Sequence, residues 1–239
     1  MANQVPFLVQ SLVSTRVTTN TNTRTITYVG GHLAVVVIVM ATAANTVLSV
    51  TDTLSNTYTN LPNASGYSNT SLTPRMEMWY AYNVRGGATT ITVTESASGT
   101  SSKIMYAHEF GGVQSLSDPL DVQKFGTGSS ASPTTGASST TAVASELVVV
   151  GCGDAGSGTS ITVGAGYKGF LSDATSPSEI STEYNVTTAT GAQTGTVGFD
   201  NPAAYAIGLA TFKGAPVGVP NNYQQLKVGD GLSTSEKVR

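Results

Sequence analysis

Charged side chains are scarce in this sequence of 239 residues. Asp, Glu, Lys and Arg together make up 10% of the chain, against about 25% in an ordinary soluble domain. Lys and Arg form no cluster, and the formal net charge is −3. We therefore expect no nucleic-acid partner, because binding to a phosphate backbone needs a basic face. Ser, Thr, Gly, Ala and Asn fill the polar positions instead, which predicts a surface of hydroxyl and amide groups.

Cysteine and long apolar runs are equally rare. The single cysteine, Cys152, excludes a disulfide within the chain, and its apolar neighbours predict a buried, unreactive thiol. The longest apolar run, residues 32–41, is shorter than the about 20 residues that cross a bilayer as a helix. It predicts a strand buried on both faces, and we expect no membrane partner. The first sixteen residues lack the pattern of a signal peptide, so we expect a protein made and kept in a cytosol.

Thr, Val, Ile and Tyr dominate short segments that alternate between apolar and polar residues, as strands do. The predicted strands are residues 12–18, 24–29, 32–41, 46–52, 76–84, 89–94, 103–110, 146–151, 159–163, 181–187, 193–199 and 204–213. About a dozen short strands without a long helix predict an all-β protein, an antiparallel β-sandwich.

A low-complexity stretch, residues 126–145, interrupts this pattern. It is too polar to pack, and it reads as a long surface loop or, alternatively, as a linker between two modules. Residues 31–37 and 145–150 share a polar residue, a leucine and a valine run, which suggests two equivalent core strands. We favour a single sandwich domain over 12–213 with a long loop at 126–145, preceded by an N-terminal arm at 1–11.

The chain after residue 213 changes character, because Pro216, Pro220 and several glycines prevent a regular element. We expect residues 214–239 to form an extended C-terminal arm that lies in a groove of a neighbouring subunit; the alternative is a frayed terminus. Its assembly residues would be the apolar side chains Val217, Val219, Tyr223, Leu226 and Val228.

Residues 146–156, ELVVVGCGDAG, match the glycine spacing of a dinucleotide-binding loop. That loop works only when a helix follows it, and here the next residues are Thr, Ser, Ile, Thr and Val in β-type alternation. We predict instead a core strand with Val148 and Val150 buried. Gly151, Gly153 and Gly156 are then expected in a tight turn.

No catalytic, cofactor-binding or metal-ligating set stands out in the sequence. His32 and His108 lie outside any recognisable triad and are predicted to be structural. The carboxylates are scattered, and Asp118 to Asp121 is better explained as a turn with local side-chain hydrogen bonds than as a calcium loop. We therefore expect a protein that is not an enzyme and needs no cofactor.

Aromatic residues are the most suggestive binding feature. Trp79, the only tryptophan, would share a strand face with Glu77 and Asn83, where it could pack in the core, lie in a subunit interface or stack on a sugar. The candidate interface or ligand aromatics are Tyr58, Tyr67, Trp79 and Tyr167.

Seven weak motifs follow one another in a suggestive order. They are GHLAVVV (31–37), SVTDTLSNTY (49–58), WYAYNVRGGATTITVT (79–94), AHEFGGV (107–113), DPLDV (118–122), SELVVV (145–150) and YAIGLATFKG (205–214). Together they resemble a β-sandwich module of phage virion proteins and bacterial surface proteins. The resemblance implies a jelly-roll or immunoglobulin-like sandwich that displays or binds, with no catalytic residues.

This resemblance, together with the predicted arm, leads us to expect a phage structural protein, most simply a capsid decoration or head accessory protein. It would be assembled in the host cytoplasm, reside in the virion, self-associate, and clasp capsid or other virion proteins through its termini. The alternative is a module of a tail fibre or bacterial surface adhesin that binds host surface glycans or a receptor.

Overall fold

The computed structural model describes residues 3–42, 45–61, 74–96, 102–154, 160–170 and 180–217, and regular structure within these ranges is β-strand. The strands of the first half are β1 (Phe7–Val13), β2 (Thr21–Tyr28), β3 (Leu33–Met40), β4 (Val47–Asp52), β5 (Thr59–Asn60), β6 (Arg75–Ala81), β7 (Gly87–Glu95) and β8 (Lys103–Gly111). Those of the second half are β9 (Leu120–Ser130), β10 (Glu146–Asp154), β11 (Ile161–Val163), β12 (Lys168–Gly169), β13 (Ile180–Val186), β14 (Val197–Phe199) and β15 (Ala203–Lys213).

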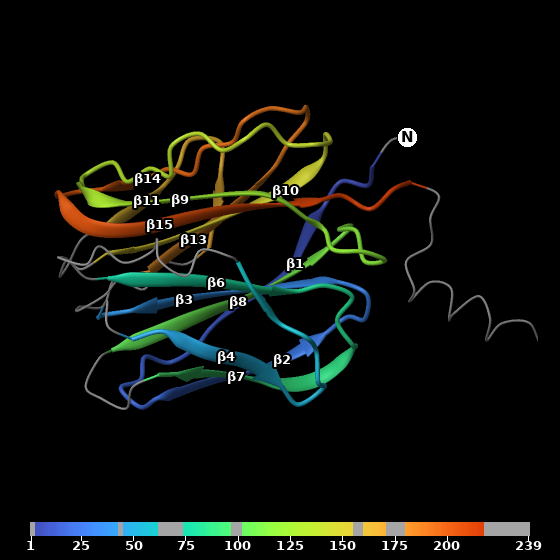
Figure 1. Cartoon of the computed structure of the whole chain (residues 1–239), viewed down its shortest axis with the longest axis horizontal. Coiled ribbons are helices and arrows are strands. Elements are labelled where there is room, and N and C mark those ends of the chain that lie inside the picture. Colours follow the sequence, from blue (N-terminus) through green and yellow to red (C-terminus); the bar gives the residue numbers. More distant parts are fainter. Residues whose placement is uncertain are drawn as a thin grey trace, which may run out of the picture.

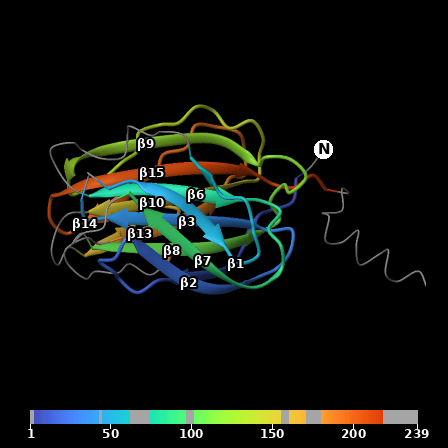
Figure 2. The same ribbon diagram turned by 60° about the horizontal axis from the view of Figure 1, so that its bottom comes forward.

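The strands form four antiparallel sheets that stack on one another (Figures 1 and 2). Two five-stranded sheets, β1-β8-β3-β6-β5 and β12-β13-β10-β15-β9, pack face to face in the middle. The three-stranded sheet β2-β7-β4 covers the outer face of the first, and the pair β11-β14 covers that of the second. The prediction of an all-β protein with packed antiparallel sheets is confirmed, and none of the sheets in the described ranges closes into a barrel.

The central strands β3 and β10 are buried on both faces, as the sequence predicts. Val35 and Val37 of β3 face the core between the large sheets, whereas Val36 faces the three-stranded sheet. Likewise Val149 of β10 faces the middle core and Val148 faces the outer one. A strand with apolar layers on both sides must be apolar at every position, which explains both valine runs.

The two halves of the chain have the same strand arrangement. Read from its opposite end, the second large sheet runs β9-β15-β10-β13-β12, so each strand matches the one at the same place in β1-β8-β3-β6-β5. In the small sheets β14 pairs with β11 as β7 pairs with β4. Residues 131–141 hydrogen-bond to 191–199 in the place where β2 pairs with β7. The molecule is therefore a tandem pair of one β-unit.

Strand register extends the match to single residues. Leu33 pairs with Phe110, and Leu147 pairs with Phe212 at the same step of the second unit. The residue two positions before each leucine, Gly31 or Ser145, has a left-handed backbone with φ of 83° or 59°. The likeness between residues 31–37 and 145–150 therefore reflects equivalent strands, one in each large sheet.

The glycines after the second valine run correct the sequence prediction. Gly151 and Gly153 lie inside β10 and not in a turn. A Cβ atom at Gly151 would lie 2.6 Å from Val37 Cγ1, and one at Gly153 would lie 2.6 Å from Val39 Cγ1. These glycines allow the two large sheets to pack closely. Gly156 lies outside the described residues.

Segments expected to be loops or arms are partly integrated into the sheets. Residues 126–130 belong to β9, and 131–141 hydrogen-bond to residues 191–199, so the polar stretch 126–145 is hydrogen-bonded over much of its length. Residues 7–11 belong to β1, not to an N-terminal arm. The chain after β15 first returns to the body, where Val113 pairs with Gly214 and Asn3 with Pro216. Residues 218–239 lie outside the described ranges.

Candidate functional site

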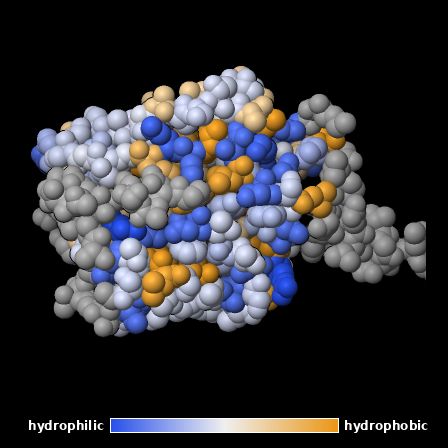
Figure 3. Space-filling view, viewed as in Figure 1, coloured by the Kyte–Doolittle hydropathy of each residue, from blue (hydrophilic) through white to orange (hydrophobic). Residues whose placement is uncertain are grey.

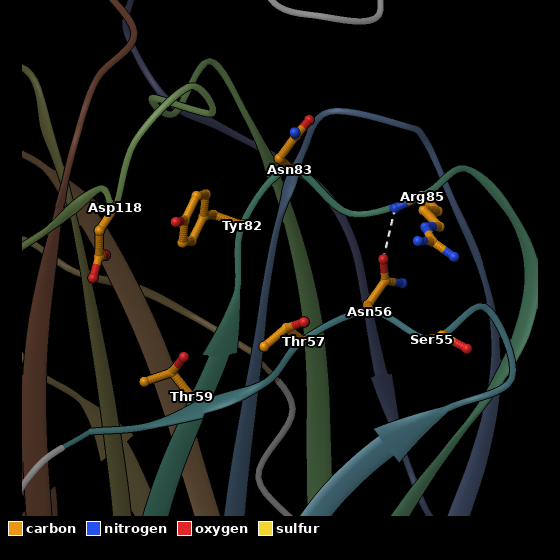
Figure 4. Close-up of a pocket in the computed structure, with 8 residues that line it drawn as sticks. All are labelled: Ser55, Asn56, Thr57, Thr59, Tyr82, Asn83, Arg85 and Asp118. Carbon is orange, nitrogen blue, oxygen red and sulfur yellow. Dashed lines mark hydrogen bonds between the residues drawn. The ribbon is translucent and has the colours of Figure 1, made fainter.

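A polar hollow of about 510 Å³ opens at the end of the molecule where β6 ends (Figure 4). Three segments supply its walls: the link between β4 and β5 with the first residue of β5, the turn after β6, and the link just before β9. The lining residues are Ser55, Asn56, Thr57, Thr59, Tyr82, Asn83, Arg85 and Asp118. All of them are polar or aromatic, and we call this site the polar pocket.

One side of the polar pocket is a row of hydroxyl groups. Side chains alternate along residues 55–59, so that Ser55, Thr57 and Thr59 are exposed. Between them Tyr58 turns inward, and its hydroxyl lies 3.0 Å from that of Tyr28 and 3.2 Å from Asp52 Oδ2. Burial raises the pKa of the Tyr58 hydroxyl far above its usual value, so it stays protonated and fixes this segment to the core.

The link between β4 and β5 is also held by its own side chains. Asp52 accepts hydrogen bonds from the backbone N–H groups of Leu54 (3.1 Å) and Asn56 (3.0 Å), and from the Asn56 amide (2.7 Å). The Asn56 Oδ1 in turn accepts the N–H of Arg85 at 2.7 Å, which is the bond drawn in Figure 4. The Arg85 guanidinium donates to the Leu54 carbonyl at 3.1 Å. These bonds preorganise the pocket wall.

Asp118 and Tyr82 form the opposite end of the polar pocket (Figure 4). The Asp118 carboxylate accepts the Tyr80 hydroxyl at 2.9 and 3.0 Å and the N–H of Leu120 at 3.0 Å. The last of these bonds confirms the predicted local turn. Burial raises the pKa of Tyr80, which keeps that hydroxyl a donor. Tyr82 is 38% exposed, so its ring is available to a ligand.

Backbone strain is concentrated in this pocket. Within the described ranges three residues other than glycine have a positive φ, and two of them, Ser55 (58°) and Asn83 (52°), line the polar pocket. The third, Ser145, lies at a turn that glycine fills in the first unit. Left-handed backbone is costly outside glycine and collects at functional sites.

The described part of the second unit differs from the first at two places that line this pocket. Tyr80 pairs with Val35 as Tyr184 pairs with Val149, so the counterpart of Tyr82 in the second unit is Val186. The link between β11 and β12, residues 164–167, is two residues shorter than that between β4 and β5, residues 53–58. The pocket is thus an addition to the repeated unit, not a requirement of its fold.

The aromatic residues expected from the sequence do not form this site. Trp79 is 9% exposed and lies in the core beneath the three-stranded sheet, where its indole N–H donates to Glu77 at 3.3 Å. The hydroxyl of Tyr167 donates to the Thr194 carbonyl at 3.0 Å. Tyr58 supports the pocket from behind, and Tyr67 lies outside the described residues.

A second surface lies on β1, an end strand of its sheet. Val5, Phe7 and Val9 are exposed at alternate positions, and Phe7 is 54% exposed although it packs edge-on to His32. Val217, the last described residue, is 53% exposed and follows the pairing of Asn3 with Pro216. We call Val5, Phe7, Val9 and Val217 the terminal apolar surface. Figure 3 shows that the face seen in Figure 1 is mostly hydrophilic or neutral, with separate small apolar groups.

The two histidines have structural surroundings. His32 lies 2.8 Å from the buried Glu109, which also accepts the N–H of Val29 at 2.7 Å. In the second unit Glu146, the counterpart of His32, accepts the N–H of Val143 in the same way, at 3.2 Å. Both units thus need a carboxylate to cap this turn, and they take it from different strands. His108 is fully buried between the large sheets.

Comparisons of the chain with models of protein families, with curated proteins and with solved structures found no match. In the described part of the chain, no three or more His, Cys, Asp and Glu side chains gather as a metal-binding group. Nor does that part contain a helix long and apolar enough to cross a membrane.

Proposed function

We propose that this protein is a non-enzymatic structural protein of a phage virion, a capsid decoration or head accessory protein that self-associates through its termini. The observation that carries the proposal is the terminal apolar surface. Phe7 and Val9 lie exposed on the end strand β1, Val5 is exposed just before that strand, and Val217 follows the pairing of Asn3 with Pro216. Exposed apolar surface on an unpaired strand edge is normally avoided unless a partner covers it.

The strand order supports a virion role. The first unit places β1-β8-β3-β6-β5 in one sheet and β2-β7-β4 in the other, and the second unit repeats the order of the larger sheet; this order fits a jelly roll better than an immunoglobulin-like sandwich. Jelly rolls are an architecture of viral capsid and lectin domains. A tandem pair of such units, joined back to back through their larger sheets, gives a rigid body for display on a particle surface.

The occupant we propose for the terminal apolar surface is the C-terminal segment of a second copy. That segment follows Val217 in the sequence, and its apolar residues are Val219, Tyr223, Leu226 and Val228. An extended peptide can pair with the free edge of β1 through its backbone while these side chains meet Phe7 and Val9. In a particle the same contact is repeated many times, so a weak arm is amplified by multivalency.

The ionisable groups support a non-enzymatic role because the structure gives them other tasks. The His32–Glu109 pair resembles the histidine and carboxylate of a catalytic triad. The second unit, however, builds the same turn with Glu146 and no histidine. Burial raises the pKa of the Cys152 thiol well above its usual value, which suppresses the nucleophilic thiolate.

The experiment is to measure the mass of the full chain in solution by light scattering over a range of concentrations, beside a chain that ends at residue 217. We expect the full chain to self-associate and the shortened chain to be monomeric. Phe7→Ser should weaken association at least tenfold, because a central buried aromatic commonly dominates an interface.

The matched control is Leu48→Ser, since Leu48 is 62% exposed on the three-stranded sheet and away from the terminal apolar surface. A full chain that stays monomeric at all concentrations would contradict the proposal, as would equal association of the Phe7 and Leu48 variants. Mass spectrometry of purified virions then tests the decoration role: many copies per particle support it, and absence from the particle refutes it.

A further inference from the structure

We propose that the polar pocket binds a neutral saccharide. This inference goes beyond assembly and concerns a different surface, because β8 and β3 lie between β1 and β6 in the sheet. A loss of one function would therefore leave the other measurable.

The lining of the pocket matches the chemistry of a sugar ring. Thr57 and Thr59 present hydroxyl groups that form no hydrogen bond within the described part of the chain, so they are free to exchange bonds with a ligand. Tyr82 supplies one exposed aromatic face, on which the C–H side of a pyranose can stack. Asp118, Tyr82 and Thr59 surround the same hollow in Figure 4. A sugar needs this combination of one flat apolar face and several convergent polar groups.

The charges in the pocket favour an uncharged ligand. Asp118 at one end and Arg85 at the other contribute one charge of each sign. A phosphate or carboxylate ligand near Thr59 would meet the Asp118 carboxylate, and a cation would find only that single carboxylate. A hydroxyl-rich neutral ligand, in contrast, can donate to Asp118 and accept from Arg85 without an unpaired charge.

The pocket is already in its binding form. Asp118 is fixed by the Tyr80 hydroxyl and the Leu120 N–H, and Arg85 is fixed by the Leu54 carbonyl and by Asn56. Side chains that are held in place lose little conformational entropy when a ligand binds. Ser55 and Asn83 have left-handed backbones, and Val186 stands in place of Tyr82 in the second unit, which indicates that the site is not a by-product of the fold.

The experiment uses the full chain on an array of immobilised neutral glycans that includes maltohexaose, cellohexaose, mannohexaose and N-acetylglucosamine oligomers. Saturation-transfer NMR with the best-bound oligosaccharide in solution follows. We expect at least one of these glycans to bind, and Tyr82→Ala to weaken binding at least tenfold. Tyr82→Phe should stay within threefold of the natural chain because it keeps the ring.

The matched control is Val186→Ala, which changes the counterpart of Tyr82 in the second unit and should leave binding unchanged. Thr59→Val is a second pocket variant that keeps the side-chain shape, and it should weaken binding at least threefold. Circular dichroism checks that each variant is folded. The inference is overturned if no neutral glycan binds, or if the bound glycan is retained equally by Tyr82→Ala, Thr59→Val and Val186→Ala. The mass of Tyr82→Ala in solution should equal that of the natural chain, which separates this result from a failure of assembly.

Discussion

Val37 and Gly151 occupy the same position of the repeated unit and face each other between the two large sheets. A Cβ atom on Gly151 would lie 2.6 Å from Val37 Cγ1, and Met78 Cε would lie 3.6 Å away. A second pair, Val39 and Gly153, has the same relationship one step further along the strands. Two copies of one unit thus meet through a valine on one side and a glycine on the other. Valines on both sides would collide.

The first prediction concerns this contact. Gly151→Ala should lower the free energy of unfolding by about 1 to 3 kcal/mol, because it overfills a packed core next to a stiff β-branched side chain. The double variant Gly151→Ala/Val37→Ala should lose less stability than the sum of the losses of the two single variants, because the smaller side chain at position 37 makes room for the new methyl group.

Urea denaturation of the four proteins measures this coupling. Gly191→Ala is the control, because a Cβ there meets only the Gln193 amide at 4.0 Å, and it should change stability little. Strict additivity of the Gly151 and Val37 changes would contradict the packing we describe.

The second prediction follows from His108, whose ring is buried and stacks on Phe170 with a centroid distance of 4.3 Å. Neither ring nitrogen has a hydrogen-bond partner in the described part of the chain, and burial lowers the pKa of His108 from 6.5 to about 3. As the pH falls, His108 is therefore protonated in the unfolded chain at a higher pH than in the folded chain. Stability contributed by the neutral ring is present above pH 6.5 and falls by about 1.4 kcal/mol per pH unit as the pH drops towards 3.

His108→Phe should remove this loss, so its advantage over the natural chain should grow steadily from pH 6.5 to pH 4. Urea denaturation at several pH values measures the difference between the two proteins. Parallel pH profiles would show that His108 is not buried as a neutral ring.

The third prediction has the opposite pH dependence. Glu183 is buried, and burial raises its pKa from 4.5 to about 7, although Gly164 N–H donates to it at 2.7 Å. As the pH rises, Glu183 loses its proton in the unfolded chain at a lower pH than in the folded chain. The free energy of unfolding of the natural chain therefore falls by about 1.4 kcal/mol per pH unit between pH 4.5 and 7. Glu183→Gln keeps the acceptor for Gly164 and should be the more stable protein above pH 7, with little difference at pH 4. A variant that is less stable at pH 8 would contradict this assignment.

The fourth prediction tests the equivalence of the two turn caps. Thr211 is the counterpart of Glu109 in the second unit, so Glu109→Thr gives the first unit the residue found there. The change leaves the Val29 N–H without the carboxylate that accepts it. We expect it to cost about 1 to 2 kcal/mol, since a partly buried donor loses its hydrogen-bond partner. Adding His32→Glu, the counterpart of Glu146, should restore part of that stability.

Thermal or urea denaturation of the single and double variants measures the restoration. His32→Gln is the comparison that removes the histidine without supplying a carboxylate, and it should not restore Glu109→Thr. If the Gln and Glu changes act alike, the caps of the two units are not equivalent.

The sequence predicts most strands because strand periodicity is local. Residues 24–29 and 89–94 alternate, and the valine runs are apolar throughout, so β2, β7, β3 and β10 follow directly. Strand β9 escapes this reasoning because its Gly, Ser and Thr residues look like a loop, while its hydrogen bonds come from β15, far away in the chain. The positions of Gly151 and Gly153 depend on the opposite sheet, which no local pattern reveals.

The polar pocket could not be found in the same way. Asp118, Asn56 and Tyr82 belong to three segments that are far apart in the sequence. The hydrogen bond from Tyr80 to Asp118 brings the segment of Tyr82 and the segment of Asp118 together. The sequence did indicate aromatic residues in this region, and it identified the turn at Asp118. The sequence emphasised Trp79, but this residue lies inside β6 and is buried in the core. Strand β6 ends at Ala81, so Tyr82 directly after it is the aromatic side chain that reaches solvent.

The pairing at the end of the chain has a mechanical consequence. The Ala215 carbonyl accepts the Gln4 N–H at 2.6 Å, the Ala215 N–H donates to Gly112 at 2.8 Å, and the Gln114 N–H donates to Lys213 at 2.9 Å. Tension applied beyond residue 217 would therefore be carried in shear by the N-terminal segment and by the link between the units. A pulling force on the C-terminal segment would therefore be distributed over both units before β15 separates from its sheet.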